Sequence, residues 1–151
     1  MDEKMKIAII DDEKDMRESI SQWLSLSGHK TKTYTKAVDA LSDIGSDYRG
    51  IVITDIKMPE MDGIEFLKKL MIKDSSIPVI LITGHGDVAM AVKAMHIGAY
   101  DFLEKPFDPN RIAEIAKRAI HTRKLVIDNR LLRRELSDGT VLLRKLIGSS
   151  Q

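Results

Sequence analysis

The sequence predicts an α/β fold in which a doubly wound, five-stranded parallel sheet carries helices on both faces and is followed by an extended C-terminal helix. Two observations support this fold class. Short apolar runs alternate along the chain with stretches of helical periodicity. Near the C-terminus, a long segment without Gly or Pro continues the last helical pattern beyond the length that a compact domain needs.

Five short runs are predicted as strands because they are bounded by turn residues and are rich in apolar or β-branched side chains. Three of the runs are almost wholly apolar, which is typical of parallel strands that are buried on both faces. The crossovers between them are expected to be right-handed. In chain order, the predicted strands are Lys6–Ile10, Lys30–Tyr34, Ile51–Thr54, Pro78–Thr83 and Tyr100–Leu103.

Amphipathic stretches between these runs are predicted as helices, since their apolar residues recur at helical spacing. Gly28 is expected at the end of one helix and Asp87 at the start of another. Asp108 and Pro109 predict an N-cap followed by proline at the first helical position. The apolar faces comprise Met16, Ile20, Trp23 and Leu24; Ile64, Leu67 and Met71; and Val88, Ala91, Val92 and Met95.

The last helical pattern spans residues 110–136, or about 40 Å of helix at ~1.5 Å per residue. Heptads counted from Ile115 place Leu125, Asn129, Leu132 and Leu136 on one seam. A buried Asn at such a position favours a parallel two-stranded coiled coil. We therefore expect a homodimer through this linker helix; the alternative is an ordinary amphipathic helix with the same spacing.

Composition sets further limits. The 151 residues suit one domain with an appendage, and the absence of cysteine excludes disulfides, thiolate metal sites and cysteine nucleophiles. That absence fits a cytoplasmic location, and no apolar run approaches the ~20 residues that cross a bilayer. Residues 1–108 carry 14 basic and 19 acidic side chains, whereas residues 109–151 carry 10 and 4. This asymmetry predicts two segments with different roles, but no recognition helix for DNA follows the basic one.

Polar side chains follow the predicted strands at the edge where a doubly wound sheet binds its ligands. Asp11 and Asp12 follow the first strand, and Asp55 follows the third. Thr83 ends the fourth strand, and Lys105 comes just after the fifth. We therefore expect three carboxylates, a hydroxyl and an ammonium group to converge at this edge.

This set of groups suits phosphoryl transfer. Three neighbouring carboxylates repel one another unless a cation intervenes, and their oxygens suit Mg²⁺. A carboxylate is also a nucleophile toward phosphorus, and a metal, a cation and hydrogen-bond donors stabilise the charge on the transferred group. Singly, Asp12 is explained as a helix cap, Thr83 as a strand residue and Lys105 as a solvated lysine; five such residues at four strand ends favour the chemical explanation.

Four motifs resemble the receiver domain of two-component response regulators over about residues 5–121. The resemblance implies a flavodoxin-like receiver fold with Asp55 as the phosphoacceptor. It also implies that Asp12, Asp55 and the backbone carbonyl of Lys57 bind Mg²⁺, while Asp11 acts largely through water. The motifs are Ile10-Asp11-Asp12-Glu13, the segment from Thr54 to Gly63, Thr83-Gly84-His85 and Lys105-Pro106-Phe107.

The same resemblance assigns roles in switching. Thr83 is expected to move toward the phosphoryl group and hydrogen-bond to it, and Lys105 to pair with it. Phe102 occupies the position of the switch aromatic residue. The Lys105–Pro106 peptide bond is expected to be cis, which X–Pro bonds permit at modest cost.

Other segments resemble the nitrogen-regulatory class of sigma-54 activators, in particular the regulators of C4-dicarboxylate transport. The class implies a sensor histidine kinase as phosphodonor and a dimer that controls a downstream ATPase domain. We expect a receiver over residues 1–121, its last helix continuing as a coiled-coil linker over 110–136, and the truncated start of an ATPase over 137–151. The segments are Gly84–Asp87, Gly98–Phe102, Lys124–Arg134 and Leu146–Gly148.

Two other functions remain as alternatives. A Mg²⁺-dependent phosphohydrolase of the haloacid dehalogenase type also uses an aspartate nucleophile, but in an Asp-x-Asp motif, whereas Asp11 and Asp12 are adjacent. A pseudo-receiver that binds partners without phosphorylation would normally lack one of the five polar residues. We therefore expect a signalling switch whose only chemistry is self-phosphorylation and autodephosphorylation, not an enzyme.

Overall fold

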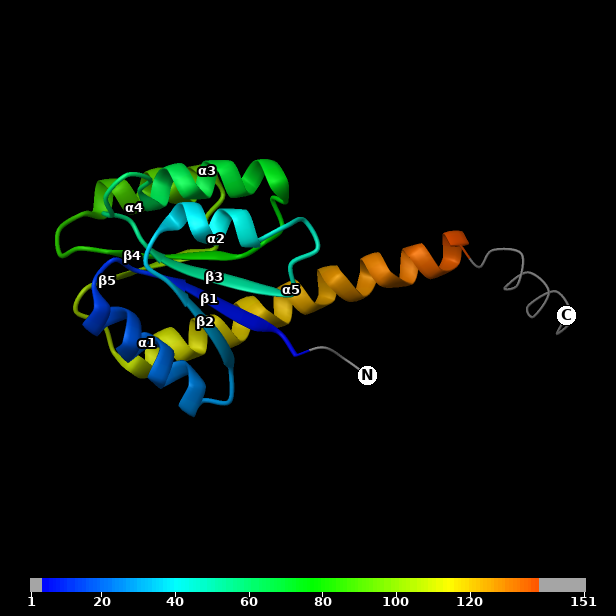
Figure 1. Ribbon diagram of the computed structural model, residues 1–151, viewed down its shortest axis with the longest axis horizontal. Coiled ribbons are helices and arrows are strands. Elements are labelled where there is room, and N and C mark those ends of the chain that lie inside the picture. Colours follow the sequence, from blue (N-terminus) through cyan, green and yellow to red (C-terminus); the bar gives the residue numbers. More distant parts are fainter. Residues whose placement is uncertain (1–3, 139–151) are drawn as a thin grey trace, which may run out of the picture.

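The computed structural model describes residues 4–138, which form five parallel strands and five helices in alternation (Figure 1). The strands are β1 (Lys6–Ile10), β2 (Lys30–Tyr34), β3 (Gly50–Asp55), β4 (Val79–Thr83) and β5 (Asp101–Glu104). The helices are α1 (Lys14–Leu26), α2 (Ala37–Asp43), α3 (Gly63–Lys73), α4 (Val88–Ile97) and α5 (Pro109–Asp138).

The sheet has the order β2-β1-β3-β4-β5, so the chain reverses direction across the sheet after β2. This is the strand order of flavodoxin-like doubly wound folds, and the predicted fold class is confirmed. The predicted strands agree with the observed ones to within one residue at each end. Asp55 is itself the last residue of β3.

Two apolar cores lie on opposite faces of the sheet. Helices α2, α3 and α4 cover one face, and α1 and α5 cover the other (Figure 1). The β1, β3 and β4 side chains alternate between the two cores, which explains why these strands are apolar at almost every position. Phe66, Leu67 and Leu70 of α3 anchor one core, and Ile112 and Ile115 of α5 anchor the other.

The helix ends follow most of the predicted signals. Gly28 comes two residues after the end of α1 with a φ of +91°, a conformation that glycine adopts without strain. Asp108 accepts a hydrogen bond from the Asn110 amide where α5 begins. Asp87 stands at the N-cap position of α4, but its side chain caps no amide of that described helix and instead pairs with Lys57.

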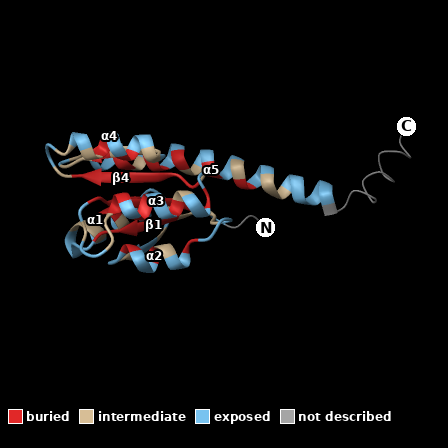
Figure 2. Cartoon of the chain, turned by 90° about the horizontal axis from the view of Figure 1, so that it is seen from above, coloured by how far each residue is buried: buried red, intermediate tan, exposed pale blue. Residues whose placement is uncertain are grey.

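Helix α5 spans 30 residues, and its second half extends beyond the edge of the sheet (Figures 1 and 2). The long helix predicted over residues 110–136 is confirmed, and Ser137 and Asp138 continue it. The rest of the segment predicted as the start of an ATPase, residues 139–151, lies outside the described residues. Among residues 4–138, no helix combines the length and the apolar character needed to cross a membrane.

Candidate functional site

The five polar residues predicted from strand ends meet at one edge of the sheet. Asp11 directly follows β1, and Asp55 ends β3, which pairs with β1. Thr83 ends the next strand, β4, and lies opposite Glu104 in β5, one residue before Lys105. Parallel pairing thus places side chains from distant parts of the sequence side by side.

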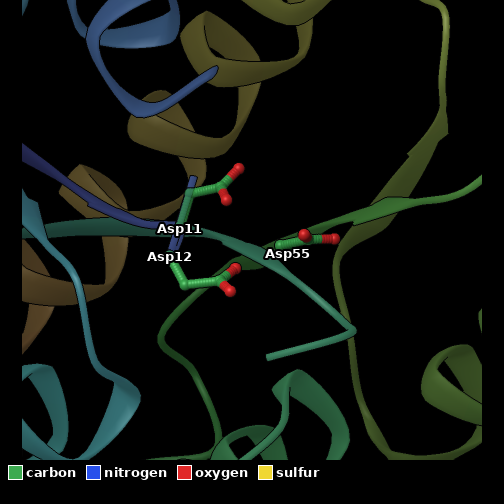
Figure 3. Close-up of side chains that lie close together, drawn as sticks. All are labelled: Asp11, Asp12 and Asp55. Atoms are coloured by element: carbon green, nitrogen blue, oxygen red, sulfur yellow. The ribbon is translucent and has the colours of Figure 1, made fainter. Parts of the chain in front are cut away.

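Asp11, Asp12 and Asp55 form a tight carboxylate cluster, in which one oxygen of each residue lies within 4.8 Å of the others (Figure 3). Asp11 and Asp55 are buried, whereas Asp12 is exposed and forms the open side of the cluster. Asp11 accepts a hydrogen bond from the Glu13 amide at 2.9 Å through Oδ1. Its other oxygen, Oδ2, is buried without a hydrogen-bond partner among the described residues.

Burial makes the ionised form of these carboxylates costly. It raises the pKa of Asp11 to about 6, with a further contribution from the charge on Asp55, against the opposing effects of the Glu13 amide and Lys105. Burial also raises the pKa of Asp55, although Lys105 and the Ile56 amide oppose this shift. Negative charge at this edge is therefore incompletely compensated by the protein.

The donor set fits a hard divalent cation. Carboxylate oxygens are the ligands that Mg²⁺ prefers, and a cation would satisfy the buried Oδ2 of Asp11 and offset the repulsion between the three carboxylates. Asp12 and Asp55 are the residues best placed to hold it, with Asp11 behind them. Thiolate or imidazole metal sites are unsupported here, since the cluster contains only carboxylates.

Lys105 and Thr83 border the cluster on the side of β4 and β5. The Lys105 ammonium lies 3.5 Å from Asp55 Oδ2, and the Lys105–Pro106 peptide bond is cis, as predicted. Thr83 is buried, and its hydroxyl donates a long hydrogen bond of 3.4 Å to the Leu103 carbonyl. Because so long a bond is weak, the hydroxyl is available to a stronger acceptor.

Sequence reasoning missed two features of the loops around Asp55. Gly63 begins α3 directly behind the site, where an added Cβ would lie 2.4 Å from the Asp55 carbonyl oxygen. Lys57 pairs with Asp87 at 3.0 Å and so links the loop after β3 to the loop after β4. The Asp62–Gly63 pair before an apolar helix was the available signal for the first feature; the second depends on tertiary structure alone.

A largely apolar pocket of about 500 Å³ opens beside Lys105. Trp23 of α1 and Phe107 of the loop after β5 form an edge-to-face pair on its wall, with ring centroids 6.1 Å apart. The pocket gives a bulky molecule an apolar surface next to the carboxylate cluster. The remaining lining residues are Met16, His85 and Pro106.

The other predicted residues lie away from the cluster. Phe102 is partly buried against the core beneath α2, α3 and α4. On α5, Leu125 and Leu132 are 58% and 55% exposed, and Asn129 is also exposed. The heptad start at Ile115 was wrong, because Ile115 packs into the core of its own domain and is 1% exposed.

The decisive comparison is with protein families: the response regulator receiver domain matches residues 7–117. This chain belongs to that family. Its relatives are regulatory proteins, and the carboxylate cluster is the acidic pocket of the receiver domain.

Two relatives of the receiver are C4-dicarboxylate transport transcriptional regulatory proteins DctD. The protein from Rhizobium meliloti is 45% identical over 128 residues, which cover 85% of this chain and 28% of the relative. The protein from Pseudomonas aeruginosa is 44% identical over 149 residues, which cover 99% of this chain and 32% of the relative. The chain thus spans about a third of the length of these curated relatives.

Solved structures of receiver domains match the fold closely. The crystal structure of FixJ-N has a TM-score of 0.72 and 40% identity, covering 80% of this chain and 96% of that one. The receiver domain of NtrX from Brucella abortus has a TM-score of 0.73 and 38% identity, covering 77% and 98%. These likenesses, together with the DctD relatives, place the chain among the receiver domains of transcriptional regulatory proteins.

Proposed function

We propose that this receiver takes a phosphoryl group from a histidine kinase onto Asp55 and passes the signal to the segment that follows α5. The observation that carries the proposal is the convergence on Asp55 of Lys105, at 3.5 Å, and of two further carboxylates within 4.8 Å. A buried nucleophile between an acidic pocket and one ammonium group has the polarity that phosphoryl transfer requires.

In the proposed reaction, an Asp55 carboxylate oxygen attacks phosphorus and forms an acyl phosphate. The bond from phosphorus to the donor's imidazole nitrogen breaks, and the imidazole leaves with the bonding pair. When bound by Asp12, Asp55 and the Lys57 carbonyl, with Asp11 acting through water, Mg²⁺ would neutralise charge on the phosphoryl oxygens. Lys105 would exchange its present pairing with Asp55 for one with a phosphoryl oxygen.

Two residues would convert this chemistry into a change of shape. The Thr83 hydroxyl would leave the long bond to the Leu103 carbonyl for a phosphoryl oxygen. Phe102 of β5 lies opposite Leu81 of β4 and packs against the core. Its ring would respond to the space that Thr83 vacates. Both residues sit on β4 and β5, so the signal would travel toward α4 and α5.

The proposed output is a homodimer that pairs through residues 110–136 of α5. Three exposed leucines at seven- and four-residue spacing on the outer side of this helix, Leu125, Leu132 and Leu136, support the pairing, because this is the spacing of a coiled-coil seam. By analogy with the sigma-54 activators that the sequence resembles, the dimer would control a sigma-54-activating ATPase in the cytoplasm, without direct DNA contact by this chain. The receiver would then act as a signalling switch with only self-phosphorylation and autodephosphorylation chemistry.

The central test is the mass of the chain after incubation with a small phosphodonor and Mg²⁺. The parent should gain one phosphoryl group, and Asp55→Asn, which keeps the side-chain volume but lacks the nucleophile, should gain none. Equal labelling of the two proteins would refute the assignment of Asp55. Rapid turnover of a phosphoester would favour a phosphohydrolase, and a parent that stays unlabelled would favour a pseudo-receiver.

Metal binding has a separate test. Trp23 lies on α1, which begins two residues after Asp12, so its fluorescence is a convenient probe for a Mg²⁺ titration. Asp12→Ala should weaken binding strongly, because too few carboxylates then remain to offset the dehydration of Mg²⁺. Asp39→Ala, which removes an exposed carboxylate from α2 on the other face of the sheet, is the matched control. An unchanged titration in Asp12→Ala would contradict the assigned ligand set.

A further inference from the structure

A buried polar cluster joins α5 to two loops at the edge of the sheet opposite Asp55. Its centre is Arg123, whose side chain is completely buried. The guanidinium donates to the Tyr48 carbonyl at 2.9 Å, the Ser46 carbonyl at 3.1 Å, the Ser76 hydroxyl at 2.8 Å and the Asp74 carboxylate at 3.0 Å. All three of its nitrogens are therefore engaged, as a buried charge requires.

Arg130 reaches the same carboxylate from two helical turns further along α5. Its two terminal nitrogens hold both oxygens of Asp74, at 2.7 and 3.0 Å. Asp74 also accepts from the amide and the hydroxyl of Ser76. One turn beyond, Arg134 pairs with Asp47 at 2.6 Å. These contacts extend past the last apolar packing of α5, since Ile127 is the final buried apolar residue of the described helix.

The contacts to the body and the exposed leucines lie on opposite sides of α5. Arg123, Ile127, Arg130 and Arg134 are spaced by four, three and four residues, and we call them the body row. The exposed residues Leu125, Asn129, Leu132 and Leu136 have the same spacing, and we call them the leucine row. The two rows are offset by two residues, which is a rotation of about 200° around the helix axis. Figure 2 shows buried and exposed residues alternating where α5 leaves the sheet, and only intermediate and exposed residues toward its outer end.

We propose that Asp74, Arg123 and Arg130 form an orientation clamp, which holds the outer half of α5 helical and turns the leucine row toward a second copy of this chain. An isolated helix of this length is only marginally stable in water, so its order depends on contacts of this kind. Bidentate arginine–carboxylate pairs fix direction as well as distance. The choice of a second copy as partner rests on the proposed function, whereas the clamp itself rests on contacts within one chain.

Hydrogen exchange of the α5 amides tests the clamp without involving the dimer. In a Leu132→Asp background, Arg130→Gln should speed exchange over residues 124–138 by at least about tenfold. Arg133→Gln removes the same charge from the next residue, for which no ion pair is found among residues 4–138, and should leave exchange unchanged. Equal protection in the two variants would overturn the clamp. Arg130 is only partly buried, so its replacement should not unfold the body; an unchanged thermal transition reported by Trp23 checks this.

Cross-linking tests the orientation and the partner. The chain has no cysteine, so single cysteines report on one position each. Leu132→Cys should form disulfide dimers several-fold faster than Arg133→Cys, and adding Arg130→Gln should remove that preference. Loss of the preference supports the clamp, and its persistence overturns the assigned orientation. A parent that sediments as a monomer, together with no disulfide dimer from Leu132→Cys, would overturn the choice of a second copy, while the exchange experiment decides the clamp independently.

Discussion

Gly63→Ala is expected to destabilise the domain and distort the phosphoacceptor loop together. An added Cβ would lie 2.4 Å from the Asp55 carbonyl oxygen and 2.8 Å from the Ile56 Cα. Both neighbours are backbone atoms, so no change of rotamer relieves the contact. The start of α3 must therefore move away from the end of β3.

The cost follows from the contacts that this movement changes. Forcing an extra carbon into a packed site costs about 1–3 kcal/mol. The 2.8 Å hydrogen bond from the Gly63 amide to the Ile56 carbonyl would also be strained or lost, at about 0.5–1.5 kcal/mol. A total loss of about 2–4 kcal/mol is a large share of the ~5–15 kcal/mol that stabilises a typical domain.

Urea unfolding followed by Trp23 fluorescence measures this loss. For a slope of ~2 kcal/mol per molar urea, the midpoint should fall by about 1–2 M. Gly45→Ala is the matched control, because no described heavy atom outside its immediate neighbours lies within 4 Å of its added Cβ. Equal midpoints for the two alanine variants would refute the steric argument.

Three further predictions concern the site and the linker. Asp11→Asn should stabilise the metal-free chain: burial raises the pKa of Asp11 from 3.8 to about 6, so the parent should lose up to about 3 kcal/mol as pH rises from 4 to 6, a loss that thermal unfolding in EDTA should not find in the variant. Thr83→Ala should still accept the phosphoryl group, but its phosphorylation-dependent change in assembly should weaken by roughly tenfold to a hundredfold, the worth of one hydrogen bond to a charged group; a full response measured by sedimentation would contradict its switch role. Leu132→Asp, and separately truncation after His121, should abolish dimerisation in sedimentation, with Ile72→Asp on the exposed surface of α3 as the control; parent-like dimers in both linker variants would exclude α5 as the interface.

The polar residues at the carboxyl ends of the strands could be placed from the sequence. Each one follows a short apolar run, and parallel strands bring such positions to the same edge whatever their separation in the chain. Asp11, Asp55 and Lys105 were therefore predicted together without knowledge of any contact. Their pKa values and the long Thr83 hydrogen bond were not predictable, because they depend on burial and on distances of a few tenths of an ångström.

The cluster around Asp74 could not be predicted in the same way. A charged residue on a helix is usually solvated, and Asp74 and Arg123 are joined by no local motif. The available signal was that Arg123 continues the apolar row of α5 between Ala119 and Ile127. The same row shows why heptads counted from Ile115 began on the wrong residue: the first half of the helix uses that side for its own sheet.

Because α5 is one continuous helix from the sheet to Asp138, it sets the rotation of its C-terminal end relative to the domain as well as the distance between them. Each residue added between the body row and the following segment would turn that segment by about 100° around the axis, while seven residues would nearly restore its original direction. Insertions of similar size but different helical phase, such as five and seven residues, would therefore have unequal effects. A flexible linker would fix only how far the following segment lies from the domain. The outer half of α5, held by the body row, would fix the direction in which that segment faces as well.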